Sequence, residues 1–284
     1  MSEIVARATE DDVAEIARRR WSDSETRRLY LYLASAAPNG AWVARDEGTP
    51  VGIAIAHQLE TEWYLCDLFV EPSFRGRGLG GRLLAEAARD AGDVTRSGLL
   101  DPAELGGIAF FARRRVAART PVLRFAGRIP KEEQLAALAV GEHRFETEPL
   151  DPIRHRFALD ALDVETRGSA RHADQLYFVS NAHGSAFSIN GEFVGYAYVW
   201  PDGRIGPLAS FSPSYIVAFF AFGMMALARS HGASWCSALV PAVNVRVARA
   251  AGDAGLKVQG VSLFARDLDE IDMSRYVGYH SLLF

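Results

Sequence analysis

The segment from Arg75 to Gly81, RGRGLGG, alternates glycine and arginine between a predicted strand and a predicted helix. At such a junction, successive backbone N–H groups and the positive end of the helix dipole converge on an anion. Glycines let the backbone approach phosphate oxygens closely and adopt positive φ angles. Arg75, Arg77 and Arg82 would add positive charge. The pattern predicts a cradle for a diphosphate, and its alternative is an arginine-rich turn that binds nothing.

Two common nucleotide-binding motifs do not fit this segment. It lacks the Gly-Lys-Ser/Thr of a P-loop, and a dinucleotide fingerprint would follow the first strand of a βαβ unit. Here the loop follows the third strand of a predicted antiparallel meander, with Pro72 two residues beyond Val70, the last residue of that strand.

From Val70 the pattern V-x-P-x-x-R-G-x-G-x-G, followed by Leu83-Leu84, resembles motif A of the GNAT superfamily of acetyltransferases. The resemblance covers about residues 1 to 127 and is sharp from Leu65 to Leu84. It implies acetyl-coenzyme A as cosubstrate, with no metal, and a pantetheine arm lying where the fourth strand splays from the fifth. It also implies that the coenzyme is bound by the backbone of Phe69 and Val70 and by the loop residues Arg75, Gly76, Arg77, Gly78, Leu79 and Gly80.

Acetyl transfer requires the acceptor amine to lose a proton, so a carboxylate near the splay is a candidate base. Asp67 lies eight residues before Arg75, and some aminoglycoside acetyltransferases of the resembled family carry an Asp proposed as the base at that spacing. The alternative, equally weighted, is a strand residue paired with a neighbouring arginine. Glu62, with Glu60, can act through a water, although residues that flank a turn are more often solvated.

The resembled family often uses a tyrosine as general acid on the helix after its fifth strand, and Phe111 stands at that place here. A positioned acid contributes about 10² to 10⁴-fold, so its absence slows the reaction without forbidding it. Tyr64 or a water would be the substitute. The four arginines on the nearby helix either meet an acidic ligand or form a solvated surface, which is the more common case: Arg113, Arg114, Arg115 and Arg119.

The elements needed to position this loop follow from the hydrophobic periodicity of the first half. Thr9 to Asp12 has the form of a capping box at the start of the first helix. The predicted strands span residues 4–7, 41–45, 51–58, 64–70, 97–100 and 122–125. The first predicted helix begins near residue 9, and the other three span residues 22–35, 80–91 and 103–118. We expect these elements to form a domain over residues 1–128.

The second half repeats this order, and we expect a second domain over residues 140–284, with the boundary between Ile129 and Gly141. The predicted strands are 145–150, 185–189, 193–199, 235–240 and 258–265, with a further hairpin at 201–203, and the predicted helices are 153–162, 170–179, one from Ser212 to about Gly232, and 244–254. Asn244 to Leu256 resembles a later helix motif of the same family. The loop from Ala209 to Tyr215 has no glycine and no arginine, which predicts a degenerate coenzyme site. The predicted fold class is therefore α+β, of the three-layer α/β type: two tandem acyl-coenzyme A N-acyltransferase folds, each a mixed sheet flanked by helices.

Bulk composition narrows the function classes. The chain has 284 residues, 49% hydrophobic and 23% charged, which is typical of soluble domains. A formal charge of -4 disfavours a nucleic acid partner. The two cysteines form no CxxC pair, so no metal site is expected. The most apolar stretch, Ile216 to Ala228, is shorter than the roughly 20 residues needed to cross a bilayer, and the N-terminus lacks an apolar signal, so we expect a cytoplasmic protein without a membrane partner.

The resemblance implies an N-acetyltransferase that moves an acetyl group directly to the amine of a small molecule or peptide. Two alternatives stay open. One is a non-catalytic acyl-coenzyme A sensor or partner-binding pseudoenzyme, which Phe111 and the degenerate second loop favour. The other is a structural protein whose glycine loop is incidental.

Overall fold

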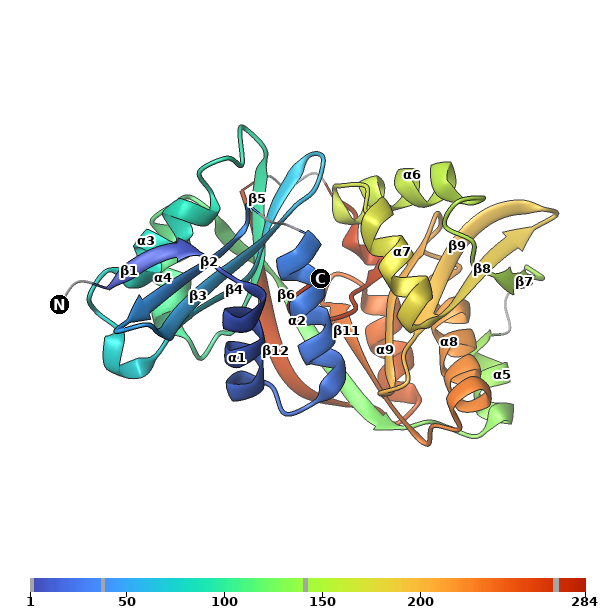
Figure 1. Ribbon diagram of the computed structural model, residues 1–284. Coiled ribbons are helices and arrows are strands. Elements are labelled where there is room, and N and C mark those ends of the chain that lie inside the picture. The colour runs from blue at the N-terminus through green and yellow to red at the C-terminus, as the bar shows by residue number, and fades with distance from the viewer. Residues whose placement is uncertain (1–2, 37–38, 140–142, 268–270) are drawn as a thin grey trace. The chain divides into compact units, whose positions relative to one another are not determined.

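The computed structural model describes residues 3–36, 39–139, 143–267 and 271–284 (Figure 1). Contacts divide the chain into two compact units: Met1–Leu99 with Arg266–Leu268, and Leu100–Ala265 with Asp269–Phe284. The domain limits expected from the sequence, 1–128 and 140–284, follow the repeated order of elements and stay a prediction. Val140 and Gly141, where the second domain was expected to begin, lie outside the described residues.

The expected repeat of strand, two helices, three strands, helix, strand, helix and strand is present. Its first copy consists of β1 (Ile4–Arg7), α1 (Glu10–Arg20), α2 (Ser24–Ala36), β2 (Ala41–Asp46), β3 (Thr49–Gln58), β4 (Glu62–Val70), α3 (Leu79–Ala87), β5 (Thr95–Leu100), α4 (Leu105–Ala112) and β6 (Ala117–Arg128). A short 3-10 helix, η1 (Pro72–Phe74), precedes α3. The second copy consists of β7 (Glu146–Pro149), α6 (Arg156–Arg167), α7 (His172–Asn181), β8 (His183–Ile189), β9 (Glu192–Val199), β10 (Arg204–Ser210), α8 (Ile216–His231), β11 (Trp235–Pro241), α9 (Val245–Asp253) and β12 (Lys257–Arg266). Between the copies lies α5 (Glu132–Ala139), and after them come η2 (Met273–Arg275) and β13 (Tyr276–Val277).

In the first unit, the sheet runs in the order β1-β2-β3-β4-β5. Neighbouring strands are antiparallel from β1 to β4, whereas β4 and β5 are parallel. Helices α1 and α2 pack together and contact β3, while α3 contacts β2, β3 and β4. The sheet therefore has a mixed character and helices on its faces, as the fold class requires (Figure 1).

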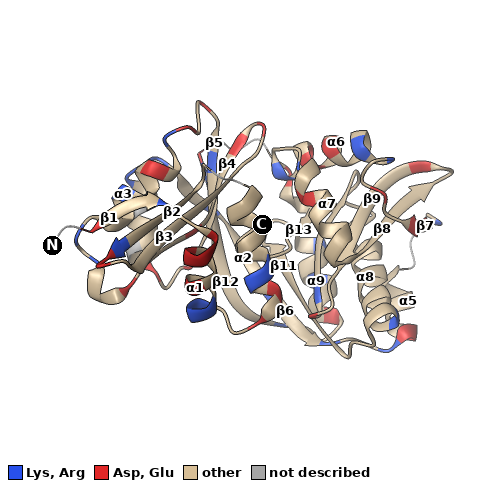
Figure 2. Cartoon of the chain, viewed as in Figure 1, with Lys and Arg blue, Asp and Glu red and all other residues tan. Residues whose placement is uncertain are grey.

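The first helix begins where the capping box predicts. The Thr9 side chain accepts from the Asp12 N–H, and the Asp12 carboxylate accepts from the Thr9 N–H at 2.7 Å. Figure 2 shows the acidic first turn and the basic last turn of α1, which complement the helix dipole. Burial opposes ionisation of Asp12, but hydrogen bonds from Thr9 and the Arg45 guanidinium hold the pKa of this carboxyl below its usual value.

A bulge in β4 decides which residues face α1 and α2. Tyr64 pairs with His57 and Asp67 pairs with Ile55, so the register shifts at Cys66. Because an extra residue reverses the alternation of a strand, Tyr64 and Asp67 come to lie on the same face of the sheet.

The second unit contains a sheet in the order β12-β6-β11-β10-β9-β8-β7, with β13 added beside β10. Strand β6 pairs antiparallel with β11 along seven residues, so α4 and β6 belong by contact to this unit. The core centres on α8, whose fully buried residues pack on the sheet and on Leu135 of α5: Ile216, Phe219, Phe220, Met224 and Leu227. None of the described helices is both long and apolar enough to cross a membrane.

Several element bounds differ from the prediction. Helix α3 ends at Ala87 rather than at residue 91, and α4 ends at Ala112 rather than at 118. The shorter α4 follows from the left-handed φ of 63° at Arg115, which turns the chain into the 12-residue strand β6. Helix α5 occupies most of the predicted polar boundary segment, where no helix was expected.

Candidate active site

The glycine-rich loop lies between β4 and α3, as the sequence predicts. Beyond β4 the chain forms η1 and then turns at Gly76 and Gly78, whose φ angles are 80° and 81°. Gly78 is the residue immediately before α3, and a β-carbon at either glycine would meet no atom within 4 Å. The glycines are thus required by the left-handed backbone, and the space in front of them is open.

The backbone N–H groups of this loop are available to a ligand. Within the part of the chain that the structure describes, the amides of residues 76 to 80 donate to no acceptor, whereas the Arg82 N–H donates to the Gly78 carbonyl at 3.1 Å. The first turn of a helix has no internal acceptors for its N–H groups, so these amides carry the partial positive charge of the α3 terminus. An anion would satisfy them.

The three predicted arginines surround the loop but are held by backbone carbonyls. The Arg75 Nε donates to the Val70 carbonyl at 3.0 Å, and Arg77 donates to the Ser73 carbonyl at 3.1 Å. Arg82 donates to the carbonyl of Glu3 at 2.8 Å. All three side chains remain exposed, so they add positive charge around the loop while stabilising its shape.

Strands β4 and β5 separate where the resemblance expects a splay. Their parallel pairing runs from Glu62 and Thr95 to Leu65 and Gly98, although β4 continues to Val70. The predicted residues Phe69 and Val70 lie on this end of β4, which pairs with β3 but not with β5, and both side chains are partly buried. The bulge at Cys66 stands at the point of separation and provides its physical cause, since a bulge bends and twists a strand.

Asp67, the predicted base, is paired with two residues that the sequence analysis did not identify. Its Oδ2 accepts hydrogen bonds from the Arg20 guanidinium and from the Tyr30 hydroxyl, the latter at 2.6 Å. The carboxylate is 9% exposed and the Arg20 side chain 22% exposed. The pairing with arginine that was the alternative for Asp67 is therefore present. No sequence signal links these residues, because they are 47 and 37 positions from Asp67.

Glu62 is not solvated, contrary to the expectation for a residue beside a turn. Its side chain is fully buried, and its Oε1 accepts from Ser97 and, at 2.7 Å, from the Arg266 guanidinium. Arg266 lies 204 residues later in the chain. The turn places Glu62 at the first position of β4, and burial with a counter-ion follows from the fold rather than from local sequence. Tyr64, two residues further, is also fully buried.

Phe111 lies on α4 and is buried, at 6% exposure. Its ring supplies no hydroxyl for proton transfer. Three of the four arginines predicted as a helical basic face follow α4 in a turn, and all four are exposed: Arg113, Arg114, Arg115 and Arg119. Their exposure agrees with the solvated surface that was the commoner alternative.

The equivalent loop of the second unit, between β10 and α8, lacks the glycines, the arginines and the left-handed turns of the first. Tyr215, which precedes α8, has a φ of -90°. The Tyr215 N–H donates to the Ser212 carbonyl at 3.1 Å, and the Ser214 N–H to the Ser212 hydroxyl at 3.3 Å. Both N–H groups therefore already donate to acceptors within the loop and are not available to a ligand. From the loop's other side, Arg275 donates to the Phe211 carbonyl at 2.8 Å.

The splay of the second unit is filled by residues 275–284, which we name the C-terminal segment. Strands β10 and β11 pair in parallel at Ile205 and Ala238 and then diverge. Between them, Val277 pairs with Leu208 of β10, and the Gly278 N–H donates to the Leu239 carbonyl of β11 at 2.8 Å. This segment was not predicted from the sequence, because a strand of two residues gives no periodic signal.

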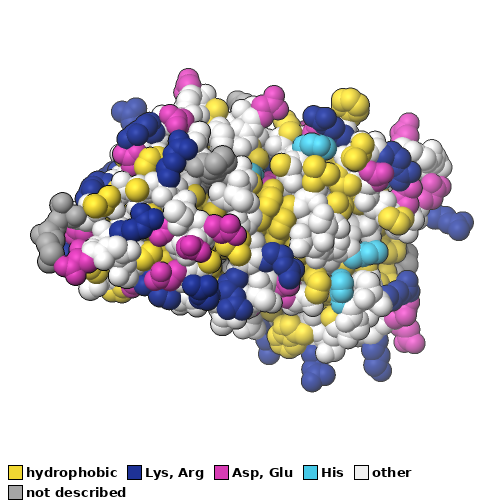
Figure 3. All heavy atoms as spheres, in the orientation of Figure 1, with side chains coloured by type: hydrophobic (Ala, Val, Ile, Leu, Met, Phe, Trp, Pro, Cys, Tyr) yellow, Lys and Arg dark blue, Asp and Glu magenta, His cyan; other side chains and the backbone are white. Residues whose placement is uncertain are grey.

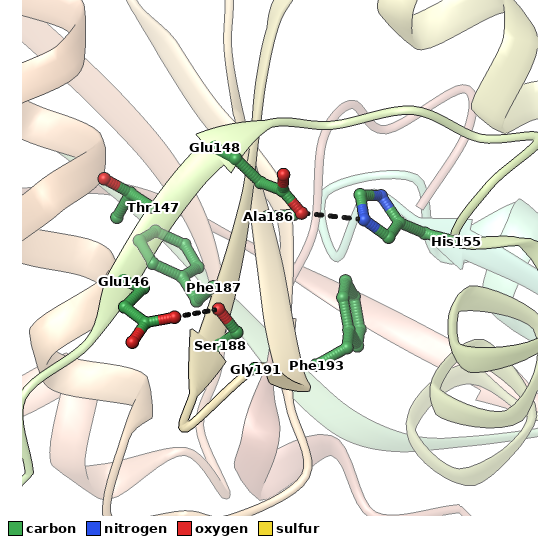
Figure 4. Close-up of a pocket in the computed structure, with 9 residues that line it drawn as sticks. All are labelled: Glu146, Thr147, Glu148, His155, Ala186, Phe187, Ser188, Gly191 and Phe193. Atoms are coloured by element: carbon green, nitrogen blue, oxygen red, sulfur yellow. Dashed lines mark hydrogen bonds and ion pairs between the residues drawn. The ribbon is translucent and has the colours of Figure 1, made fainter.

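A pocket in the second unit contains no residue of the predicted site. This pocket, of about 410 Å³, is lined by Glu146, Thr147, Glu148, His155, Ala186, Phe187, Ser188, Gly191 and Phe193 (Figure 4). Figure 4 shows its polar groups paired with one another, Glu148 with His155 at 3.1 Å and Glu146 with Ser188 at 3.4 Å.

On the face drawn in Figure 3, charges of both signs are interspersed. Among the described residues, no cluster of three or more His, Cys, Asp or Glu side chains could hold a metal ion.

Known proteins resemble this chain in sequence over one region and in fold over nearly all of it. Residues 7–114 match the model of the Acetyltransferase (GNAT) family. A Pyrococcus horikoshii protein titled "A Putative Acetyltransferase" shares 16% identity, with a TM-score of 0.74 over 99% of this chain and 95% of that chain. A GCN5-related N-acetyltransferase from Sphaerobacter thermophilus shares 15% identity, with a TM-score of 0.64 over 96% and 98% of the two chains.

A tandem GNAT protein from the clavulanic acid biosynthesis pathway shares 16% identity, with a TM-score of 0.62 over 93% of this chain and 97% of that chain. No curated protein matches the sequence. At such identities the solved structures establish the fold, which extends over both copies of the repeated order. The family model covers the region that contains the glycine loop and β4, so residues 7–114 match the GNAT acetyltransferase family.

Proposed function

We propose that this protein is an N-acetyltransferase that transfers the acetyl group of acetyl-coenzyme A directly to an amine of a small molecule or peptide. The observation that carries the proposal is the group of free backbone N–H donors from Gly76 to Gly80 at the start of α3. A diphosphate needs several donors in one place and open space before them, and this loop supplies both.

The residues present fit coenzyme A. The loop would hold the diphosphate, and Arg75, Arg77 and Arg82 would add charge near it. The end of β4 that does not pair with β5, at Phe69 and Val70, would offer backbone groups to the pantetheine. The second unit would bind no coenzyme, since its loop has no glycine or arginine, its Ser214 and Tyr215 amides are engaged, and β13 lies in its splay.

When bound, acetyl-coenzyme A supplies an activated thioester. The acceptor nitrogen forms a bond to the acetyl carbon, the carbon–sulfur bond breaks, and the proton of the nitrogen passes to a carboxylate. We assign this proton to Asp67, whose side chain keeps 9% of its surface exposed, because the side chains of Glu62 and Tyr64 are fully buried. The departing thiolate has a conjugate acid of pKa about 8.5 and takes its proton from solvent, so no tyrosine is needed at Phe111.

A coenzyme-binding protein without catalysis is the second candidate, and the buried Phe111 favours it. Both candidates predict binding of acetyl-coenzyme A. Only the enzyme predicts that an acceptor amine releases free thiol.

The test is release of free thiol from acetyl-coenzyme A, followed with a thiol-reactive dye against a panel of amino acids, polyamines, aminoglycosides and peptides. Burial raises the pKa of the protein's own Cys236 thiol to about 12, so this thiol should stay silent in the native state. Acceptor-dependent thiol release that Asp67→Asn lowers by about 10² to 10⁴-fold would support the enzyme. Coenzyme binding without release for any amine would favour the sensor, and no coenzyme binding would contradict both.

A further inference from the structure

Arg20 and Tyr30 both donate to the same oxygen of Asp67, although they come from different helices. We propose that they are positioning residues, which fix this carboxylate so that its other oxygen receives the proton of the acceptor amine. This inference rests on the proposed function. The inference goes beyond that function because it assigns roles to Arg20 and Tyr30, which neither the glycine loop nor the sequence pattern identifies.

The two donors come from rigid surroundings and fix the rotation of the Asp67 carboxylate. Arg20 is the last residue of α1, and its guanidinium lies over the rings of Phe69 at 4.4 Å and Trp21 at 5.0 Å. Aromatic faces hold a planar cation in one orientation. Tyr30 is fully buried on α2, so its hydroxyl is also fixed. Two immobile donors to Oδ2 define the rotation of the carboxylate and leave Oδ1 without a partner among the described residues.

The surroundings of Tyr30 and Arg20 keep both groups protonated. Burial and the adjacent negative charge of Asp67 raise the pKa of Tyr30 well above its usual value. Although burial opposes the charge of Arg20, its pKa is also raised, because Asp67 is beside it. Both groups therefore keep their protons wherever the enzyme is assayed, and they act as donors rather than as acids or bases.

The placement and exposure of Asp67 differ from those of a carboxylate in the core. Asp67 faces α1 and α2 only because of the bulge at Cys66, which stands where β4 leaves β5. In the second unit, a comparable set of residue types, Asp163, Arg171 and Tyr196, is completely buried and serves the core. The set in the first unit differs, since Asp67 and Arg20 keep 9% and 22% of their side chains exposed. A carboxylate held rigidly at a partly open position fits proton transfer better than support of a core.

The experiment compares kcat and KM of the full chain with those of Tyr30→Phe, Arg20→Gln and Arg20→Lys, with Arg18→Gln as the matched control. Arg18 is an exposed arginine in the same last turn of α1. Because each charge-assisted hydrogen bond contributes a factor of about ten or more, we expect kcat to fall about tenfold in Tyr30→Phe and further in Arg20→Gln. Arg20→Lys should recover part of the loss, and KM for acetyl-coenzyme A should stay within about twofold in all variants.

A purely structural role would lower the melting temperature of these variants without changing kcat per folded molecule, and that result would overturn the inference. An Asp67→Asn variant with unchanged kcat would also overturn it, while leaving the proposed acetyl transfer intact. If the unmodified protein releases no thiol with any amine, the proposed function fails and this inference falls with it. Calorimetry with acetyl-coenzyme A is run in parallel. It shows whether a protein that releases no thiol still binds the coenzyme, and so separates loss of coenzyme binding from loss of proton transfer.

Discussion

Replacing Gly78 by alanine should weaken coenzyme binding about 100-fold while the fold persists. Gly78 has a φ of 81°, and a methyl group there would point into open space rather than into the protein. The left-handed conformation costs an alanine about 1 to 2 kcal/mol. The protein should therefore fold, but with the methyl group in the space that the phosphate oxygens would occupy and with a loop less able to hold its shape.

The magnitude follows from the lost hydrogen bonds. If two charge-assisted bonds from backbone N–H groups are lost, each contributing about 1.5 kcal/mol, the dissociation constant rises about 100-fold. Acetyl-coenzyme A at 100 times the original dissociation constant would stabilise the unmodified protein by about 2.7 kcal/mol and the variant by only about 0.4 kcal/mol. Thermal unfolding with and without the ligand measures this difference.

Gly48→Ala is the matched control, because Gly48 has a φ of 85° in the turn between β2 and β3 and also meets no atom within 4 Å. Both variants should lose similar stability without ligand, and only Gly78→Ala should lose the ligand response. An equal ligand response in the two variants would refute the assignment of this loop.

Three further predictions concern the rest of the molecule. Arg266→Met should lower the free energy of unfolding by about 3 to 5 kcal/mol in urea, because it leaves Glu62 buried without its counter-ion, and a loss below 1 kcal/mol would be inconsistent with this role. Asp12→Asn should destabilise the protein at neutral pH, because the pKa of Asp12 is lowered in the folded state by Thr9 and Arg45. That contribution is present above the pKa of the unfolded chain and is lost as the pH falls through the lower folded value, so the gap between variant and parent should close in acid. Calorimetry should give one coenzyme per chain, since the second splay is filled by the C-terminal segment, and a stoichiometry of two would contradict that reading.

Structural features that depend only on neighbouring residues could be predicted from the local sequence pattern. The loop around Gly78 was predictable because alternating glycines and arginines before a helix are a property of a few consecutive positions. The capping box at Thr9 was predictable for the same reason. The repeated order of elements also followed from periodicity, although α3 and α4 came out shorter than expected.

Features that depend on distant contacts were not predictable. The ion pair of Glu62 and Arg266 joins residues far apart in the chain, and nothing beside Glu62 distinguishes it from a solvated carboxylate. The bulge at Cys66 has no signature in the sequence, yet it determines the face on which Asp67 lies. The C-terminal segment is too short to show a period, and only the pairing with β10 and β11 reveals that it fills the second splay.

The central claim is that backbone N–H groups at the start of α3 bind the diphosphate of coenzyme A. Calorimetry with coenzyme A, dephospho-coenzyme A and pantetheine tests it most directly, because the second ligand lacks the 3'-phosphate and the third lacks the diphosphate as well. We predict that dephospho-coenzyme A binds within about tenfold of coenzyme A, whereas pantetheine binds at least about 100-fold more weakly. Dephospho-coenzyme A binding as weakly as pantetheine, or no binding of coenzyme A, would contradict the account.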